Sequence, residues 1–293
     1  MDLMKVKMMM NNQLLNLNKR YKQKQEIVMK IVMISQIIQL NKEINKNEHK
    51  ISYSKIDNII NILLMQILHL FLIVAVLSCD IDEAAKAFKS KQIRDPIFPY
   101  TKNPYDIVDP NYLQKVSDNL QDTTSVCAIK YDDYEKQIYH LKHFNSKEEA
   151  EQNQFIVTHQ GKCGACSTLQ DLAVYLTNDL TRPVRKCGLM YGLSQHHLLK
   201  CIKGLGFTDT CAQVWLYNTL NTKKSCFWPC IVSFMTNEDF VKNGKLNKCL
   251  QCDEDISGPI FKYESGRTRR NSGIKSEIDR PDDQIYDITH CYY

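Results

Sequence analysis

The first 64 residues of this 293-residue chain contain no cysteine, glycine, proline or tryptophan. All 12 cysteines lie at or beyond Cys79, and all 10 glycines and 8 prolines also lie downstream. A segment without glycine or proline lacks two of the main turn-forming residues, and without cysteine it cannot form disulfides. The composition therefore divides the chain into a polar N-terminal part and a cysteine-rich C-terminal part.

The C-terminal part also lacks the basic surplus that is typical of nucleic-acid binding. Residues 1–58 carry 11 Lys or Arg against 5 Asp or Glu, whereas residues 59–293 carry 27 against 28. A nucleic-acid interface would require a basic face on the folded part. We therefore predict no nucleic-acid partner, and we expect residues 1–58 to form a basic tail without stable structure.

An apolar segment, Ile59–Cys79, separates the two parts. At about 1.5 Å per residue it would reach roughly 31 Å, close to the thickness of a bilayer core. It is typical of a transmembrane helix with a cytoplasmic N-terminus, or of a signal peptide with Ile67–Leu77 as its apolar core. Both interpretations place residues 80–293 in a lumen or outside the cell, and a buried core helix is the third alternative.

The high cysteine content indicates an oxidising compartment and predicts disulfide bonds. The cysteines beyond the apolar segment are odd in number, so either one thiol is free or Cys79 pairs with one of them. The candidates are Cys127, Cys163, Cys166, Cys187, Cys201, Cys211, Cys226, Cys230, Cys249, Cys252 and Cys291.

We predict a single, helix-rich, disulfide-stabilised α+β domain over residues 123–293. Residues 80–122 are expected to form a short helix and then an extended stalk, because four prolines follow one another from Pro96 to Pro110. Local patterns predict strands over 125–131, 137–144 and 155–157, and helices after Ser146 and over 167–177, 194–203 and 209–219. We expect largely irregular chain after Asn243.

The run Thr158–Ser167 (THQGKCGACS) admits three kinds of chemistry. It resembles the active-site motif of papain-like cysteine peptidases, which implies Cys166 as nucleophile, Gln160 as oxyanion donor and a distant base at His290. It also resembles a thioredoxin-type motif, with Cys163 and Cys166 exchanging disulfides and His159 shifting the thiol pKa. A third alternative is a zinc site, formed by these two cysteines with Cys249 and Cys252, and with His159 as a substitute ligand.

The simplest alternative is that these cysteines form ordinary structural disulfides, and this is the interpretation that we adopt. We accordingly predict no metal and no cofactor.

A second motif, Gly266–Gly273 (GRTRRNSG), contains three arginines in four positions. Arg267, Arg269 and Arg270 are candidates for an anion pocket that binds phosphate, sulfate or a carboxylate. The alternative is that they form structural ion pairs with the acidic run Asp253–Asp255.

The combination of T-H-x-G-x-C-G-x-C-S, C-L-Q-C-D-E and G-R-T-R-R-N-S-G resembles an uncharacterised cysteine-rich secretory or membrane family of single-celled eukaryotes. The resemblance covers about residues 155–293 and implies a shared domain without a known activity.

We therefore predict a single-pass membrane or secreted protein whose cysteine-rich domain has a non-enzymatic binding or structural role. Its predicted contacts are the membrane, through Ile59–Cys79, and an extracellular or luminal partner. The alternatives are a thiol–disulfide oxidoreductase and a papain-like peptidase.

Overall fold

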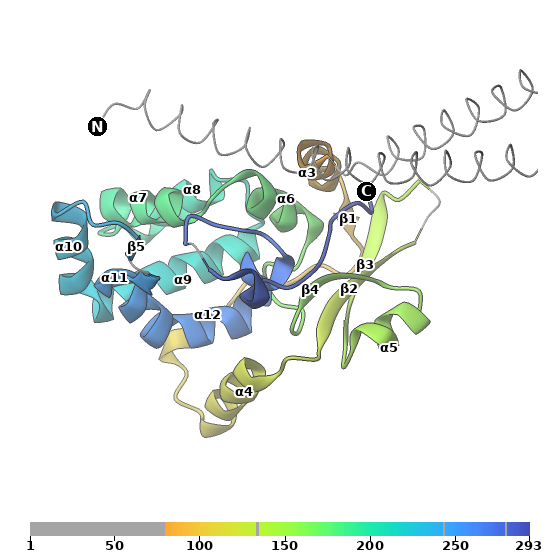
Figure 1. Ribbon diagram of the computed structural model, residues 1–293, viewed down its shortest axis with the longest axis horizontal. Helices are drawn as coiled ribbons and strands as arrows, with labels where there is room; N and C mark the ends of the chain where they lie inside the picture. The colour runs from red at the N-terminus through yellow and green to blue at the C-terminus, as the bar shows by residue number, and fades with distance from the viewer. Residues whose placement is uncertain (1–79, 133–134, 243, 279) are drawn as a thin grey trace, which may run out of the picture. The chain divides into compact units, whose positions relative to one another are not determined.

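The computed structural model describes residues 80–132, 135–242, 244–278 and 280–293, which belong to one compact unit. The tail 1–58 and the apolar segment Ile59–Cys79 lie outside the described residues. Within these ranges the fold is a helix-rich α+β arrangement, as the sequence predicts (Figure 1). The helices are α3 (Ile81–Lys89), α4 (Pro110–Gln121), α5 (Lys147–Gln152), α6 (Leu169–Thr177), α7 (Thr181–Tyr191), α8 (Gln195–Lys203), α9 (Asp209–Ser225), α10 (Phe227–Met235), α11 (Lys248–Cys252) and α12 (Gly258–Ser265).

The main sheet has four strands in the order β1-β3-β2-β4, and a two-stranded sheet pairs β5 (Val241–Lys242) with β6 (Lys245–Leu246). The four strands are β1 (Gln92–Ile93), β2 (Val126–Tyr131), β3 (Ile138–Phe144) and β4 (Ile156–Gln160). Strand β2 is antiparallel to both β3 and β4, and β1 is parallel to β3. The strands predicted over 125–131 and 137–144 are present as β2 and β3, and they pair with Val126 opposite Phe144.

The two faces of the sheet support two separate apolar clusters. Ile129 and Tyr139 face α3 and α6. Phe88 of α3 is fully buried in this cluster. Val126 and Phe144 face the opposite side and pack against α5. This alternation along the strands follows from the two-residue period of β structure.

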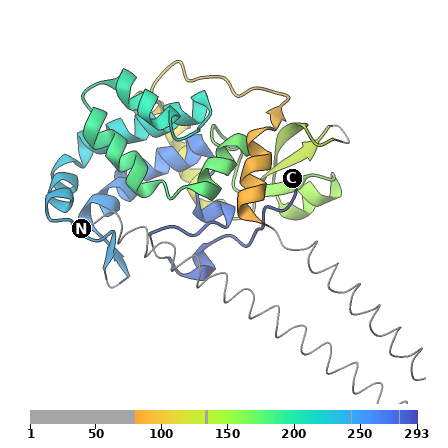
Figure 2. The same ribbon diagram turned by 90° about the horizontal axis from the view of Figure 1, so that it is seen from above.

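A third cluster holds the helical half of the domain together. Helices α6, α7, α8 and α9 contribute most of the buried residues of this cluster, including Tyr175, Leu198 and Leu216. Both views show α7, α8 and α9 toward one end of the unit and the sheet at the other (Figures 1 and 2). Helix α6 lies between the two halves, because its residues belong to both clusters.

Local capping signals account for the predicted helices that the structure contains. Asp80, Ser146, Thr168 and Ser194 are the N-caps of α3, α5, α6 and α8, and the side chain of each accepts a hydrogen bond from a backbone N–H of the first turn. Such caps satisfy amide groups that have no partner within the helix.

The structure also contains helices that the sequence analysis did not predict. Helices α7, α10 and α12 carry Pro183, Pro229 and Pro259 in their first turns. Proline is tolerated there because the first-turn amides have no acceptor inside the helix. The expectation of irregular chain after Asn243 was wrong for Lys248–Ser265, where α11, a π-helical turn and α12 follow one another. Beyond Ser265 the described residues contain only two short 3-10 turns, as expected.

The proline-rich segment is not an extended stalk in the structure. Tyr100 donates a hydrogen bond to Glu264 at 2.8 Å, and Tyr105 donates to the backbone oxygen of Ser257 at 2.8 Å. Pro104 is buried, and α4 begins at Pro110. The tyrosines between the prolines hold the segment against the domain. The prediction of a stalk considered only the spacing of the prolines and did not include these tyrosine contacts.

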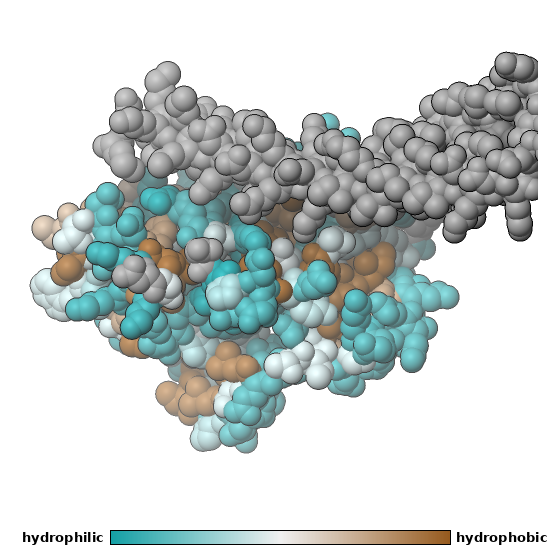
Figure 3. All heavy atoms as spheres, viewed as in Figure 1, coloured by the Kyte–Doolittle hydropathy of each residue, from teal (hydrophilic) through white to brown (hydrophobic). Residues whose placement is uncertain are grey.

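Among the described residues, no helix combines the length and the hydropathy of a membrane span. The face shown in Figure 3 is largely hydrophilic, with separate hydrophobic areas that include the end where α10 lies.

Candidate functional site

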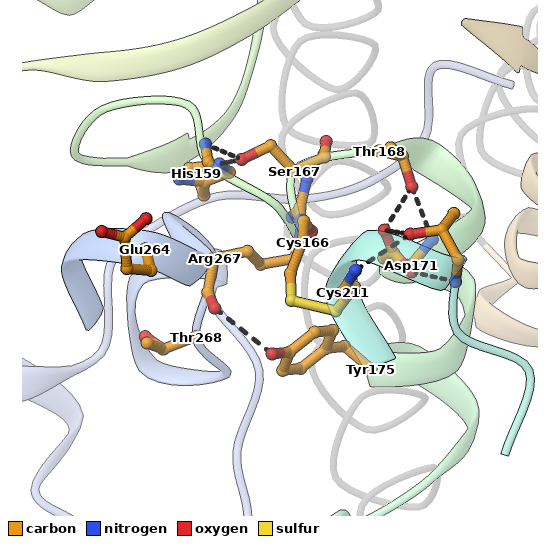
Figure 4. The surroundings of a disulfide bond; sticks show 12 residues. His159, Cys166, Ser167, Thr168, Asp171, Tyr175, Cys211, Glu264, Arg267 and Thr268 are labelled. Atoms are coloured by element: carbon orange, nitrogen blue, oxygen red, sulfur yellow. Dashed lines mark hydrogen bonds between the residues drawn. A yellow bond between two sulfur atoms is a disulfide. The ribbon is translucent and has the colours of Figure 1, made fainter. Parts of the chain in front are cut away.

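The cysteines of the C-x-x-C motif form disulfides with different partners. Cys163 is bonded to Cys127 of β2, and Cys166 is bonded to Cys211 of α9 (Figure 4). Neither residue has a thiol in this state, and the two sulfur atoms are not bonded to each other. The arrangement gives no support to the oxidoreductase chemistry, which requires a Cys163–Cys166 pair, or to the peptidase chemistry, which requires a thiolate at Cys166.

The other cysteines pair in the same structural manner. Cys187 is bonded to Cys201, Cys226 to Cys252, and Cys230 to Cys249, while Cys291 is disulfide-bonded as well. Cys249 and Cys252 therefore tie α11 to the start of α10 and do not meet Cys163 and Cys166. Within the described ranges, no group of His, Cys, Asp and Glu side chains has the arrangement of a metal site.

His159 is buried and forms part of the core. Its Nδ1 lies 2.9 Å from the backbone oxygen of Gln160, and its Nε2 lies 2.8 Å from Ser167 Oγ. Because a carbonyl oxygen only accepts, Nδ1 carries the proton and Ser167 donates to Nε2. Burial, together with the nearby Arg267, holds the pKa of His159 well below its ordinary value. The ring is therefore neutral, and it cannot be reached from solvent.

Gln160 and His290 do not join Cys166 in a catalytic arrangement. The Gln160 side chain donates to the backbone oxygen of Thr123 at 2.6 Å. His290 donates from Nε2 to the backbone oxygen of Ser272 at 2.8 Å and accepts from Tyr292 at Nδ1. Burial and Arg267 lower the pKa of His290 to about 4. Both side chains thus stabilise backbone segments.

Arg267 lies at the centre of the domain with no exposed surface. Its guanidinium group donates to the backbone oxygens of Cys166 at 3.0 Å, Thr158 at 3.1 Å and Ser167 at 3.2 Å. It also donates to Ser272 Oγ at 3.1 Å. One side chain therefore connects β4, the start of α6 and the C-terminal segment. Four of its five N–H groups are used in these contacts and it has no exposed surface, so it is not available to an external anion.

The two motifs of the sequence, about 100 residues apart, lie directly against each other. The amides of Ala165 and Cys166 donate to the backbone oxygens of Glu264 and Ser265 at 2.8 and 2.9 Å. A Cβ atom on Gly164 would lie 2.6 Å from the nitrogen of Gly266, closer than real Cβ contacts allow. Glycine in both motifs therefore permits this backbone contact.

The remaining arginines of the second motif have different environments. Arg269 donates to the backbone oxygens of Tyr175, Asn178 and Lys275, so it too is used in cross-linking chain segments. Arg270 is exposed. None of the three arginines forms a direct ion pair with Asp253–Asp255 among the described residues. Arg267 is fully buried, Arg269 is half-buried and Arg270 is exposed, so the three do not form one anion pocket.

Asp171 is a buried charged residue that the sequence analysis did not identify. Its carboxylate accepts hydrogen bonds from the Thr168 hydroxyl at 2.6 Å, and from the hydroxyl and the amide of Thr208 at 2.9 and 2.8 Å. It thereby joins the start of α6 to the start of α9. The spacing Thr168-x-x-Asp171 is a capping-box pattern and is the signal that could have identified it.

The carboxyl group of Asp171 predicts a pH dependence of stability. Burial raises its pKa from 3.8 to about 6, although the threonine hydrogen bonds oppose this shift. Because the pKa is higher in the folded chain than in the unfolded chain, the protonated carboxyl stabilises the fold below about pH 4. This contribution is lost as the pH rises through about 6 and amounts to about 3 kcal/mol.

Urea unfolding of the wild type and of Asp171→Asn between about pH 4 and 8 measures this contribution. The free-energy difference, wild type minus variant, should fall by about 2.5 kcal/mol over this range, because a small part of the contribution is already lost by pH 4. His159 and His290 also make stability depend on pH, but their contributions cancel in the difference because the wild type and Asp171→Asn both retain these residues. A difference that does not change with pH would contradict the prediction.

A cavity of about 460 Å³, open to solvent, lies in the helical half of the domain. Its walls come from α7, α9, α10, α11, the π-helical turn Asp253–Ser257, α12 and the segment 268–285. Most of the lining is apolar and includes Leu180, Val184, Trp215, Ile231, Phe261 and Ile274. Its volume is within the range of small-molecule sites.

Cations dominate the charged groups of this cavity. Arg185, Lys223, Lys262, Arg269, Arg270 and Arg280 line it, against two acidic residues, Asp253 and Glu254. Lys262 and Arg280 form ion pairs with Glu254 at 2.8 and 3.1 Å. Burial alone would raise the pKa of Glu254, but these two cations and Arg270 hold it below its ordinary value. Three cations thus lie near the single carboxylate of Glu254, so the local net charge is positive.

No curated protein and no solved structure matches the chain. Residues 195–288 match the model of a family described as a family of unknown function (DUF8771). The match runs from α8 to the C-terminal segment and covers a minority of the chain. It agrees with an uncharacterised family, whereas the resemblance to proteins of single-celled eukaryotes stays a prediction.

Proposed function

We propose that residues 80–293 form a non-enzymatic binding domain whose ligand is an amphipathic molecule with a carboxylate or phosphate group. The observation that carries this proposal is the cavity, with apolar walls and a cationic surplus beside Glu254. An apolar chain would lie against Trp215, Val184 and Ile231. The anionic group would pair with Arg270, whose side chain forms no hydrogen bond or ion pair among the described residues.

We place this domain in a lumen or outside the cell. Five disulfides with known partners support this proposal, because such bonds persist in oxidising compartments. Attachment to a membrane through Ile59–Cys79 stays a prediction, since that segment lies outside the described residues.

Photo-crosslinking of the full-length chain with a 12-carbon fatty acid that carries a diazirine tests the ligand proposal. Labelled peptides should come from α7 and α10, and excess dodecanoate should compete with labelling more strongly than dodecanol. Arg270→Gln should weaken labelling about tenfold, because a charge-assisted hydrogen bond is lost.

The matched control is Arg94→Gln, which removes an exposed arginine that is paired with Asp132 and does not line the cavity. It should leave labelling unchanged. Labelling spread over the whole surface, or equal competition by dodecanol, would refute the proposal.

A further inference from the structure

One end of the domain exposes an unusual amount of apolar surface. Nine of the sixteen large hydrophobic side chains that are exposed among the described residues fall within residues 189–193 and 227–235. We call this surface the apolar end. Trp228 is 73% exposed, Met235 79% and Leu193 98%. An exposed apolar patch of this kind marks an interaction surface.

Helix α10 has the inverse of the usual pattern of a surface helix. It contains no charged residue, and among its residues, all of which the structure describes, only Ser233 is buried. Ser233 accepts a hydrogen bond from Asn247 at 3.1 Å. The polar residue is therefore inside while Trp228, Val232 and Met235, one helical turn apart, face outward.

Disulfides hold this helix in the exposed position. Cys230 is bonded to Cys249, and Cys226, just before α10, is bonded to Cys252. The helix is thereby fixed against α11 and cannot turn its apolar face inward without breaking a covalent bond. The apolar end is a preformed feature of the fold.

The two chain segments that carry the apolar end have charges of one sign, and of these only Arg182 has an ion pair, with Glu277 of the C-terminal segment at 2.7 Å, among the described residues. Residues 181–194 and 220–236 contain five basic residues, Arg182, Arg185, Lys186, Lys223 and Lys224, and no acidic residue. Lys186, Lys223 and Lys224 are exposed. The nearest acidic residues that follow, Glu238 and Asp239, lie beyond the end of α10. The complementary partner is therefore an anionic surface.

We propose that the apolar end docks onto the surface of an anionic phospholipid bilayer. An apolar helix with exposed tryptophan and phenylalanine beside lysines is suited to the boundary between headgroups and acyl chains. Lysines at this boundary interact with acidic headgroups. Four residues of the apolar end also line the cavity, so the cavity adjoins the proposed docking surface: Leu189, Leu193, Phe227 and Ile231.

Trp228 is a direct reporter, because the chain has only two tryptophans, Trp215 and Trp228. The full-length chain with Trp215→Phe is reconstituted into vesicles of phosphatidylcholine, with or without phosphatidylserine. In anionic vesicles the Trp228 emission should move to shorter wavelength and be quenched by lipids with brominated acyl chains. Subtracting the spectrum of Trp228→Phe from that of the wild type gives the same signal without altering Trp215.

Two variants sharpen this test. The first is a reporter at position 98, made by Phe98→Trp in a chain that also carries Trp215→Phe and Trp228→Phe. Phe98 is 80% exposed, similar to Trp228, but lies outside the apolar end. Its emission should neither shift nor be quenched by brominated lipids. Lys186→Gln, Lys223→Gln and Lys224→Gln together should lower the ratio of docked to undocked chain roughly 100-fold, since each lysine contributes about fivefold.

The opposite results would overturn the proposal. These are an unchanged Trp228 spectrum, equal shifts of both reporters, or a concentration-dependent shift without lipid, which would indicate pairing of two chains. Arg270→Gln should weaken fatty-acid labelling and leave the Trp228 response unchanged, so a failure of docking and a failure of ligand binding are seen separately.

Discussion

Replacement of Arg267 by lysine should lower the free energy of unfolding by about 4 kcal/mol, a large fraction of the stability of a domain. The guanidinium group is fully buried and serves three backbone oxygens and Ser272. Lysine retains the charge, but its compact ammonium group cannot reach acceptors on several segments at once. Buried carbonyl groups left without donors account for the loss, at about 1–3 kcal/mol each.

Urea unfolding under non-reducing conditions measures this effect. Arg270→Lys, at an exposed position three residues away in the same motif, is the matched control and should change the free energy of unfolding by less than about 0.5 kcal/mol. Arg267→Met tests whether the charge or the hydrogen bonds matter, and we expect it to be at least as destabilising as Arg267→Lys. Equal stabilities of Arg267→Lys and the wild type would show that Arg267 is not a central cross-link.

Removal of the Cys166–Cys211 disulfide by the double replacement Cys166→Ala and Cys211→Ala should cost about 4 kcal/mol. The bond closes a loop with a sequence separation of 45, and the constraint that it places on the unfolded chain grows with this length. Both cysteines have no exposed surface, so alanine also leaves unfilled space in the cluster around Tyr175.

The matched control removes Cys187 and Cys201, whose sequence separation is 14. The same relation predicts a loss of about 3 kcal/mol, so the Cys166–Cys211 variant should be the less stable of the two. Mass spectrometry of unreduced wild-type peptides checks the premise, since Cys163 and Cys166 should appear linked to Cys127 and Cys211. A linked Cys163–Cys166 pair would contradict the structure and restore the redox interpretation.

The elements whose signals are local were largely predictable from the sequence. The strands around residues 125–131 and 137–144, and the helices with caps at Ser146, Thr168 and Ser194, depend on residues within one or two turns. Helices α7 and α10 were missed, because prolines and cysteines within them obscured the helical pattern.

The candidate site depends on contacts that no local pattern contains. The cavity draws its walls from segments between Tyr175 and Ile285. Its cationic surplus exists only because Lys262 and Arg280 pair with Glu254 while Arg270 lies on the same wall without an ion pair among the described residues. The buried position of Arg267 has the same origin, since its three backbone acceptors lie about 100 residues away in the chain.

The sequence by itself determined the division of the chain at Cys79, the helix-rich α+β class and the dominance of disulfides over free thiols, because these follow from composition and local periodicity. Only the tertiary structure decided which cysteines pair, what the arginines bind and where apolar surface stays exposed. Disulfide pairing and burial depend on distances between residues far apart in the chain, and these distances are set when the sheet, the helices and the C-terminal segment pack together.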